Sequence, residues 1–207
     1  MKNHKQCLLV FAKPPTPGYA KTRLIPALGQ QGAAELHRRL VLRTLAKVSS
    51  KGLWDVQLWC AGDINDDFFQ SCLSQFDISL KTQSGSDLGK RMSNAFEDAL
   101  ANYDRVVVIG TDCPLLDQKI IAESFHCLTN YPVVINPAED GGYVLLGLKS
   151  VDDKVFENVS WGTSLVTQQT LSNLNKLNWT TATLPLLWDV DLPQDLEKLA
   201  ELDDFTL

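Results

Sequence analysis

A basic, proline-rich segment follows the first apolar run of the chain and has the composition of an anion site. The run at residues 7–11 predicts a β-strand, and three cations follow it, Lys13, Lys21 and Arg23. Pro14, Pro15 and Pro17 restrict the backbone, while Gly18 permits conformations that other residues disfavour. Lysine supplies a compact charge and arginine two parallel hydrogen bonds, which together suit a polyphosphate. A solvated surface loop is the alternative, but ligands of open α/β sheets bind where strands end.

Carboxylates follow in two later segments. Asp112 comes directly after residues 105–109, the most strand-like run in the chain, where a turn or capping role is the alternative. Asp189 and Asp191 lie in one extended segment, and the alternation of extended chain points both the same way. If Asp112 and Asp191 meet, their charges repel by about 4 kcal/mol at 4 Å and an effective dielectric of 20. A divalent cation removes that repulsion, and oxygen ligands favour Mg²⁺ or Mn²⁺.

A third motif, residues 139–143, combines acidic residues with two glycines. Glycines let a substrate approach the backbone, and Asp140 has the chemistry of a general base, which contributes roughly 10²- to 10⁴-fold in rate. A simple hairpin turn explains the same residues without catalysis.

The histidines and cysteines give weaker indications of a metal site or a catalytic nucleophile. His37 and His126 fall within helical patterns and are expected to be structural, so zinc has little support. Cys113 has no histidine placed in the sequence to activate it as a nucleophile.

Alternating strands and helices must position these residues. We expect strands at residues 7–11, 56–60, 78–81, 105–109, 133–135, 143–148 and 180–184, and helices at 37–48, 63–75, 88–100, 117–128, 163–177 and from 193. Asp63 and Asp117 are expected to cap the helices that follow them. This pattern predicts a Rossmann-like, three-layer α/β/α sandwich with a mainly parallel sheet. Gly141 and Gly142 allow a sharp reversal, so one strand is expected to be antiparallel.

Composition narrows the class of protein. The 207 residues contain no evident linker, which predicts one domain over residues 1–207. A net charge of -6 argues against nucleic-acid binding. Five cysteines without a Cys-x-x-Cys pair, together with the polar N-terminus, favour a cytoplasmic protein. No apolar run approaches the ~20 residues that span a bilayer.

Four segments together resemble the nucleotide-diphospho-sugar transferase superfamily, which has the glycosyltransferase-A-type fold. They are residues 13–24, 110–114, 137–147 and 189–196. More closely, the chain is similar to small, stand-alone glycosyltransferase-like proteins related to the guanylyltransferases that activate phospholactate and molybdenum cofactor. It departs from relatives in its Asp-Val-Asp-Leu-Pro-Gln-Asp segment, where many have Thr and Glu, and at Trp161, Gly162 and Thr163, where Trp-Ser-Thr is common.

The resemblance implies roles for individual residues. The nucleotide and its phosphates are expected at the first loop and after the central strand, on Lys13, Pro14, Gly18, Lys21, Arg23 and Gly110. Asp112 and Asp191 are expected to hold Mg²⁺ or Mn²⁺, and Lys21, Arg23 and Asp140 to be catalytic.

The predicted function is that of a metal-dependent transferase with a nucleotide-activated donor. A glycosyltransferase using a nucleotide sugar is favoured, because the resemblance points there. A nucleotidylyltransferase that moves a nucleoside monophosphate from a triphosphate to a phosphorylated acceptor is the alternative, and an inactive nucleotide-binding module is the third. The expected partners are a nucleotide or nucleotide sugar and a small-molecule acceptor, in a monomer or homodimer.

Overall fold

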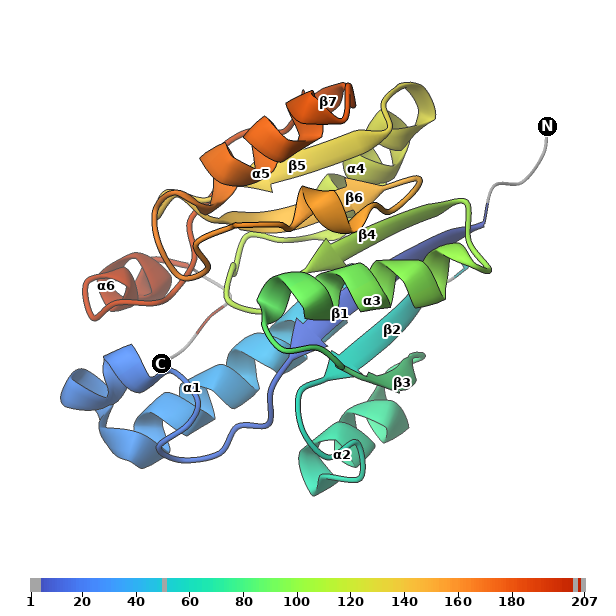
Figure 1. The fold of residues 1–207 in the computed structure, drawn as a ribbon. Coiled ribbons are helices and arrows are strands. Elements are labelled where there is room, and N and C mark those ends of the chain that lie inside the picture. The colour runs from blue at the N-terminus through green and yellow to red at the C-terminus, as the bar shows by residue number, and fades with distance from the viewer. Residues whose placement is uncertain (1–4, 50–51, 203–204, 206–207) are drawn as a thin grey trace.

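One mixed sheet organises the computed structural model, which describes residues 5–49, 52–202 and 205; Met1–His4 of the polar N-terminus thus lie outside the described residues. Seven strands are found among them, in the order β3-β2-β1-β4-β6-β5-β7 (Figure 1). Their bounds are β1 Gln6–Ala12, β2 Asp55–Cys60, β3 Ser79–Thr82, β4 Arg105–Ile109, β5 Val133–Pro137, β6 Tyr143–Leu148 and β7 Thr181–Thr183. The helices are α1 Ile25–Val48, α2 Asp67–Gln75, α3 Leu88–Leu100, α4 Gln118–Asn130, α5 Val166–Lys176 and α6 Asp195–Ala200, with short 3₁₀ turns at Thr22–Leu24 and Asp153–Val155.

Strand directions match the predicted pattern. β1 is parallel to β2 and β4, β2 to β3, and β5 to β7, whereas β6 is antiparallel to both β4 and β5. β4 is thus parallel to one neighbour only. The reversal occurs in the turn between β5 and β6, which brings that turn to the edge of the sheet where β1 and β4 end.

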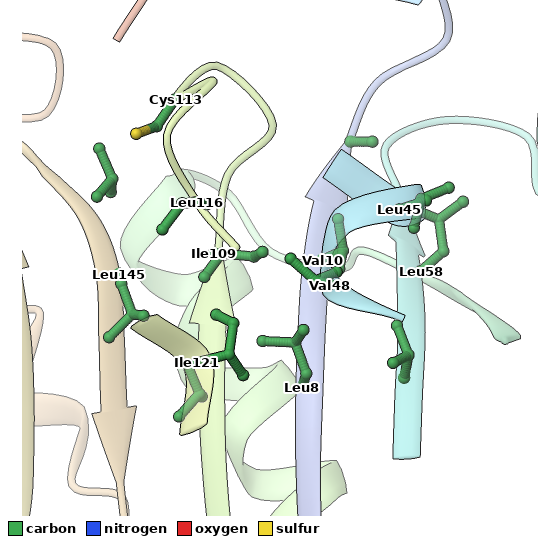
Figure 2. Close-up of a cluster of buried hydrophobic side chains, with 14 of the residues drawn as sticks. Leu8, Val10, Leu45, Val48, Leu58, Ile109, Cys113, Leu116, Ile121 and Leu145 are labelled. Carbon is green, nitrogen blue, oxygen red and sulfur yellow. The ribbon is translucent and has the colours of Figure 1, made fainter. Parts of the chain in front are cut away.

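Helices cover both faces of the sheet, as the continuous apolar composition of its central strands requires. On one face, side chains of β1, β2 and β4 pack with α1 and α4, and Figure 2 shows Leu8, Val10 and Ile109 together with Leu45 of α1 and Ile121 of α4. On the other face, β1, β4, β5 and β6 pack against α3 and α5. The predicted three-layer α/β/α fold is confirmed.

A third apolar cluster joins the C-terminal segment to the start of α1. Leu24 and Leu36 pack there with Val190 and with Leu199 of α6. This packing holds the segment that carries Asp189 and Asp191 against the loop after β1, although the two are far apart in sequence.

Several predicted helix starts are wrong: α1 begins at Ile25, twelve residues before the predicted start, and others differ by a few residues. Asp66, not Asp63, caps α2 by accepting a hydrogen bond from the Phe68 N–H; Asp63 accepts one from the Asn65 N–H instead. α5 begins at Val166 rather than Thr163, and α6 at Asp195 rather than Pro193, because turns occupy the preceding residues. Asp117 caps α4 as predicted, accepting hydrogen bonds from Lys119 and Ile120.

Two further features concern the chain as a whole. All five cysteines are free thiols, and four of them are buried. None of the helices formed by the described residues combines the length and the apolar character needed to cross a membrane.

Candidate active site

A buried ion pair joins the loop after β1 to the end of β4. Lys21 has a left-handed backbone, with φ 49°, and its side chain is only 3% exposed. Its ammonium lies 2.8 Å from Asp112 Oδ1 and also donates to the Val190 carbonyl. Burial acts to raise the pKa of Asp112, but Lys21 and, less strongly, His37 outweigh it and hold that pKa below its ordinary value. Lys21 therefore ties three segments of the site together.

The C-terminal segment is fixed beside Asp112 by its backbone. The Val190 N–H donates to the Asp112 carbonyl at 2.9 Å, and the Val190 side chain is fully buried. Asp191 forms an ion pair with Arg23, whose side chain is 57% exposed. The predicted residues Lys21, Arg23, Asp112 and Asp191 thus come together, but each cation contacts a carboxylate directly.

Asp189 adds another carboxylate to this cluster. Burial raises its pKa to about 6, and the charges of Asp140, Asp112 and Asp191 act in the same direction while Lys21 opposes them. No ion pair among the described residues includes Asp189. Burial is thus the main cause of the raised pKa of Asp189, and the neighbouring carboxylates add to it with only Lys21 in opposition.

His37 lies behind Asp112, where a purely structural histidine was expected. Its Nε2 bonds to the Lys13 carbonyl at 3.0 Å, and its Nδ1 lies 3.9 Å from Asp112 Oδ1. Nδ1 is buried without a hydrogen-bond partner among the described residues. Burial lowers the pKa of His37 despite the opposing charge of Asp112, so the imidazole is neutral at pH 7.

The turn that carries Asp140 is clamped to the loop before α5. Gly141 has φ 89°, and a Cβ there would lie 2.2 Å from the Ser164 carbonyl oxygen. The Thr167 N–H donates to the Gly141 carbonyl at 3.0 Å, and the Gly142 N–H donates to Asp140 Oδ1 at 2.8 Å. The turn expected from the glycines is present, and it holds an exposed carboxylate in a defined position.

The remaining predicted residues line the first loop and the end of β4. Lys13 is exposed, and Gly18 has φ 82° in a turn whose Tyr19 N–H donates to the Thr16 carbonyl. Gly110 is exposed directly after β4, with open space where a Cβ would project. These positions leave the loop backbone and Lys13 accessible from solvent.

Two cavities meet at Asp140. A polar cavity of about 590 Å³ is lined by Arg23, Asp140, Asp189 and Asp191, together with residues of α6. An apolar cavity of about 210 Å³ lies between α3 and β6. Asp140, Gly162 and Thr163 line both. The arrangement can hold a charged ligand on one side of Asp140 and an uncharged one on the other.

The residues fit a divalent cation that is shared with a ligand. Within residues 5–49, 52–202 and 205, no three His, Cys, Asp or Glu side chains form a complete metal-binding group. Mg²⁺ is commonly held by only one or two carboxylates together with phosphate oxygens and water. Asp112, Asp189 and Asp191 supply carboxylate oxygens of this type, and the unneutralised charge at Asp189 favours a cation.

Sequence reasoning missed two parts of this site. The sequence predicts that Asp189 points the same way as Asp191, but only Asp191 is assigned a role there. The alternation of these two aspartates with the apolar Val190 is the signal that could have identified Asp189. The aromatic wall of the apolar cavity, Tyr143 and Trp161, had no such signal, because its members come from separate segments.

Comparisons with known proteins identify the family of the chain and solved structures with the same fold. Residues 44–163 match the family described as "Uncharacterized protein conserved in bacteria (DUF2064)". A solved structure of a candidate nucleotide-diphospho-sugar transferase from Desulfovibrio desulfuricans G20 is 30% identical, with a TM-score of 0.86 over 97% of this chain and 89% of that one.

Two other proteins are more distant. The 2-phospho-L-lactate guanylyltransferase of Methanocaldococcus jannaschii is 33% identical over 75 residues, which is 35% of this chain and 34% of the relative. Glucosyl-3-phosphoglycerate synthase from Mycobacterium tuberculosis, solved with Mn²⁺, uridine diphosphate and phosphoglyceric acid, shares the fold at a TM-score of 0.57 and 9% identity, over 95% of this chain and 74% of that one.

The model of the DUF2064 family covers more than half of the chain, and the similarity to the Desulfovibrio protein extends over nearly all of it. The chain therefore belongs to the DUF2064 family and is a transferase with the nucleotide-diphospho-sugar transferase fold, as its four sequence segments predicted.

Proposed function

We propose that the protein is a metal-dependent glycosyltransferase that takes its donor from a nucleotide sugar. The observation that carries the proposal is the cluster of Arg23, Asp112, Asp189 and Asp191 at the edge where β1 and β4 end. A diphosphate with a divalent cation would satisfy both the exposed arginine and the surplus carboxylates. Glucosyl-3-phosphoglycerate synthase, which shares the fold, was solved with Mn²⁺ and uridine diphosphate, and this supports the choice of ligand.

Each residue has a part in the proposed reaction. Asp112 and Asp191 would hold Mg²⁺ or Mn²⁺, with Asp189 adding negative charge beside the ion, and the metal would supply charge stabilisation for the departing diphosphate. Arg23 and Lys13 would bind the diphosphate, the loop backbone at Pro14 and Gly18 would face the nucleotide, and Gly110 would leave room for it. Lys21, which is buried, would orient Asp112 rather than touch the donor.

Asp140 is the proposed general base. The acceptor hydroxyl would give its proton to the Asp140 carboxylate while its oxygen forms a bond to the anomeric carbon. The bond from that carbon to the diphosphate breaks at the same centre, and the nucleoside diphosphate leaves. The hydrogen bond from the Gly142 N–H to Asp140 Oδ1 orients this carboxylate toward the junction of the two cavities.

Nucleotidylyl transfer is the second candidate, supported by the local similarity to a guanylyltransferase. The same charged cluster would then bind a nucleoside triphosphate, and the product would be pyrophosphate. The two reactions are separated by what is released: a nucleoside diphosphate from a nucleotide sugar, or pyrophosphate from a triphosphate.

A thermal-shift screen tests the proposal. Nucleoside triphosphates, nucleoside diphosphates and nucleotide sugars are added to the protein with MnCl₂, and we expect at least one to raise the melting temperature. Arg23→Met and Asp112→Asn should abolish the rise. Arg38→Met is the matched control, because Arg38 is also exposed but pairs with Glu35 on α1. If no nucleotide stabilises the wild-type protein, the proposed function is wrong.

A further inference from the structure

The apolar cavity beside Asp140 is enclosed mainly by hydrophobic and aromatic side chains. The lining includes Phe11, Met92, Tyr143, Trp161 and Val166. Its volume is about 210 Å³. A cavity of about 150 Å³ lined by apolar side chains suffices to bind benzene, so this one accommodates a ring with a short substituent.

The walls of this cavity are fixed by packing. Trp161 meets Tyr143 edge-on, with ring centroids 6.5 Å apart, and also packs against Phe156. A Cβ on Gly89 would lie 2.8 Å from Trp161 Cζ2, so the absence of a side chain at this point of α3 admits the indole. The Tyr143 hydroxyl contacts Met92 Sδ at 3.9 Å. The cavity is therefore preformed, which lowers the entropic cost of filling it.

The charge of the lining restricts the ligand. Among the residues that line the cavity, all within the described part of the chain, only Asp140 carries a charge at neutral pH. Burial raises the pKa of Tyr143, so its hydroxyl stays protonated. A phosphate or carboxylate placed here would meet an anion and no cation, and would lose its hydration without compensation.

We propose that this cavity binds the acceptor, and that the acceptor is an uncharged alcohol with an apolar or aromatic body. The body occupies the space between Phe11, Met92 and Trp161, and the hydroxyl reaches Asp140 at the junction with the polar cavity. This inference rests on the proposed function, and it excludes the phosphorylated acceptor that a nucleotidylyltransferase of this type would use.

The other uncharged ring that could enter is the base of the donor nucleotide. A base in this cavity would compete with an alcohol, whereas an acceptor subsite would bind the alcohol together with the nucleotide. The cluster of Arg23, Asp189 and Asp191 lines the polar cavity and not the apolar one, which favours simultaneous binding. Gly110 lines the apolar cavity, so the donor and the acceptor would meet there.

The test uses two probes that differ in one group, 4-fluorobenzyl alcohol and 4-fluorobenzyl phosphate. Their binding to the 207-residue protein is followed by fluorine NMR line broadening, with MnCl₂ replaced by MgCl₂ to avoid paramagnetic broadening. We expect the alcohol to bind at least about tenfold more tightly than the phosphate, which is about 1.4 kcal/mol. Saturating the protein with the nucleotide found in the thermal-shift screen should leave the affinity for the alcohol unchanged.

Two matched variants locate the probe. Leu88 lines the cavity at the start of α3 and is 44% exposed, so Leu88→Trp can narrow the cavity without disturbing the core. Leu73 on α2 is 42% exposed and lines none of the cavities described here, so Leu73→Trp is the control. We expect about tenfold weaker binding of the alcohol to Leu88→Trp and wild-type binding to Leu73→Trp.

Each adverse result has a distinct meaning. Binding of the phosphate as tight as that of the alcohol, an unchanged affinity in Leu88→Trp, or competition with the nucleotide overturns the acceptor assignment while the nucleotide site stands. Failure of every nucleotide to bind overturns the proposed function, and the acceptor assignment with it, whatever the alcohol does.

Discussion

Lys21 Nζ lies 2.8 Å from Asp112 Oδ1, although the two residues come from different loops and the lysine side chain is almost fully buried. Removing the lysine leaves Asp112 Oδ1, which is buried, without its ion-pair partner, although the Asp112 side chain as a whole is 45% exposed. We expect Lys21→Met to lower the free energy of unfolding by about 1–3 kcal/mol, measured by urea denaturation. In the double variant with Asp112→Asn, the loss should be smaller than the sum of the two single losses. Additive losses would show that the pair is not coupled.

Asp189 should oppose stability in the metal-free protein and support metal binding. Burial and the negative charges of Asp140, Asp112 and Asp191 disfavour the ionised form of the Asp189 carboxylate. We expect Asp189→Asn at pH 7.5 to raise the melting temperature without metal by roughly 2–4 °C, the effect of about 1 kcal/mol in a protein of this size. The same variant should gain less from added MnCl₂ than wild type does. Asp98→Asn, in a surface pair with Lys81, is the control, and equal stabilisation by metal in the wild type and Asp189→Asn would contradict a metal site beside Asp189.

Gly141 should tolerate no side chain. Alanine there faces both a positive φ and a Cβ position 2.2 Å from the Ser164 carbonyl oxygen. Gly62 has φ 102° but open space around its Cβ position, so Gly62→Ala isolates the conformational cost, about 1–2 kcal/mol. We expect Gly141→Ala to cost at least about 2 kcal/mol more than this control, since the clash involves backbone. Thermal unfolding followed by circular dichroism measures the stability of both variants. Similar losses of stability would mean that the turn at Gly141 shifts freely to relieve the clash.

Asp153 provides a pH-dependent contribution to stability. The hydrogen bond from Ser93, followed by that from Lys90, lowers the pKa of Asp153 below its ordinary value. A lowered pKa in the folded state means that this stabilisation is present above the unfolded-state pKa, about 3.9, and is lost as pH falls through the folded-state value. We expect Asp153→Asn and Ser93→Ala each to reduce the decrease in unfolding free energy between pH 6 and pH 2, measured by urea titration. An unchanged acid slope in both variants would refute the linkage.

The fold was largely predictable because the signals were local. The β-branched run at Arg105–Ile109 and the glycine pair at Gly141 and Gly142 depend on nearby residues only, and both gave the correct strand and reversal. Helix starts were less predictable, since Asp63 and Asp66 have the same capping chemistry and only the packed helix selects Asp66.

The site was predictable in its composition but not in its pairing. The sequence identifies Lys21, Arg23, Asp112 and Asp191 as charged residues at strand ends, yet only tertiary packing decides that Lys21 is buried against Asp112 while Arg23 stays exposed beside Asp191. His37 was read correctly as a helical residue, but its approach to Asp112 depends on how α1 packs against the sheet. The roles assigned to the site residues stay predictions.

The two cavities share Asp140, Gly162 and Thr163 but take most of their lining from different parts of the chain. Leu88 and Met92 of α3, Tyr143 and Val144 of β6 and the Trp161 segment build the apolar cavity, whereas Arg23 and residues 188–201 build most of the polar one. Substitutions of residues that line only the apolar cavity therefore leave the residues of the polar cavity unchanged. Under the proposed function, substitutions in the apolar set would change the acceptor while the donor site keeps its residues, so these are the positions at which to retarget the protein.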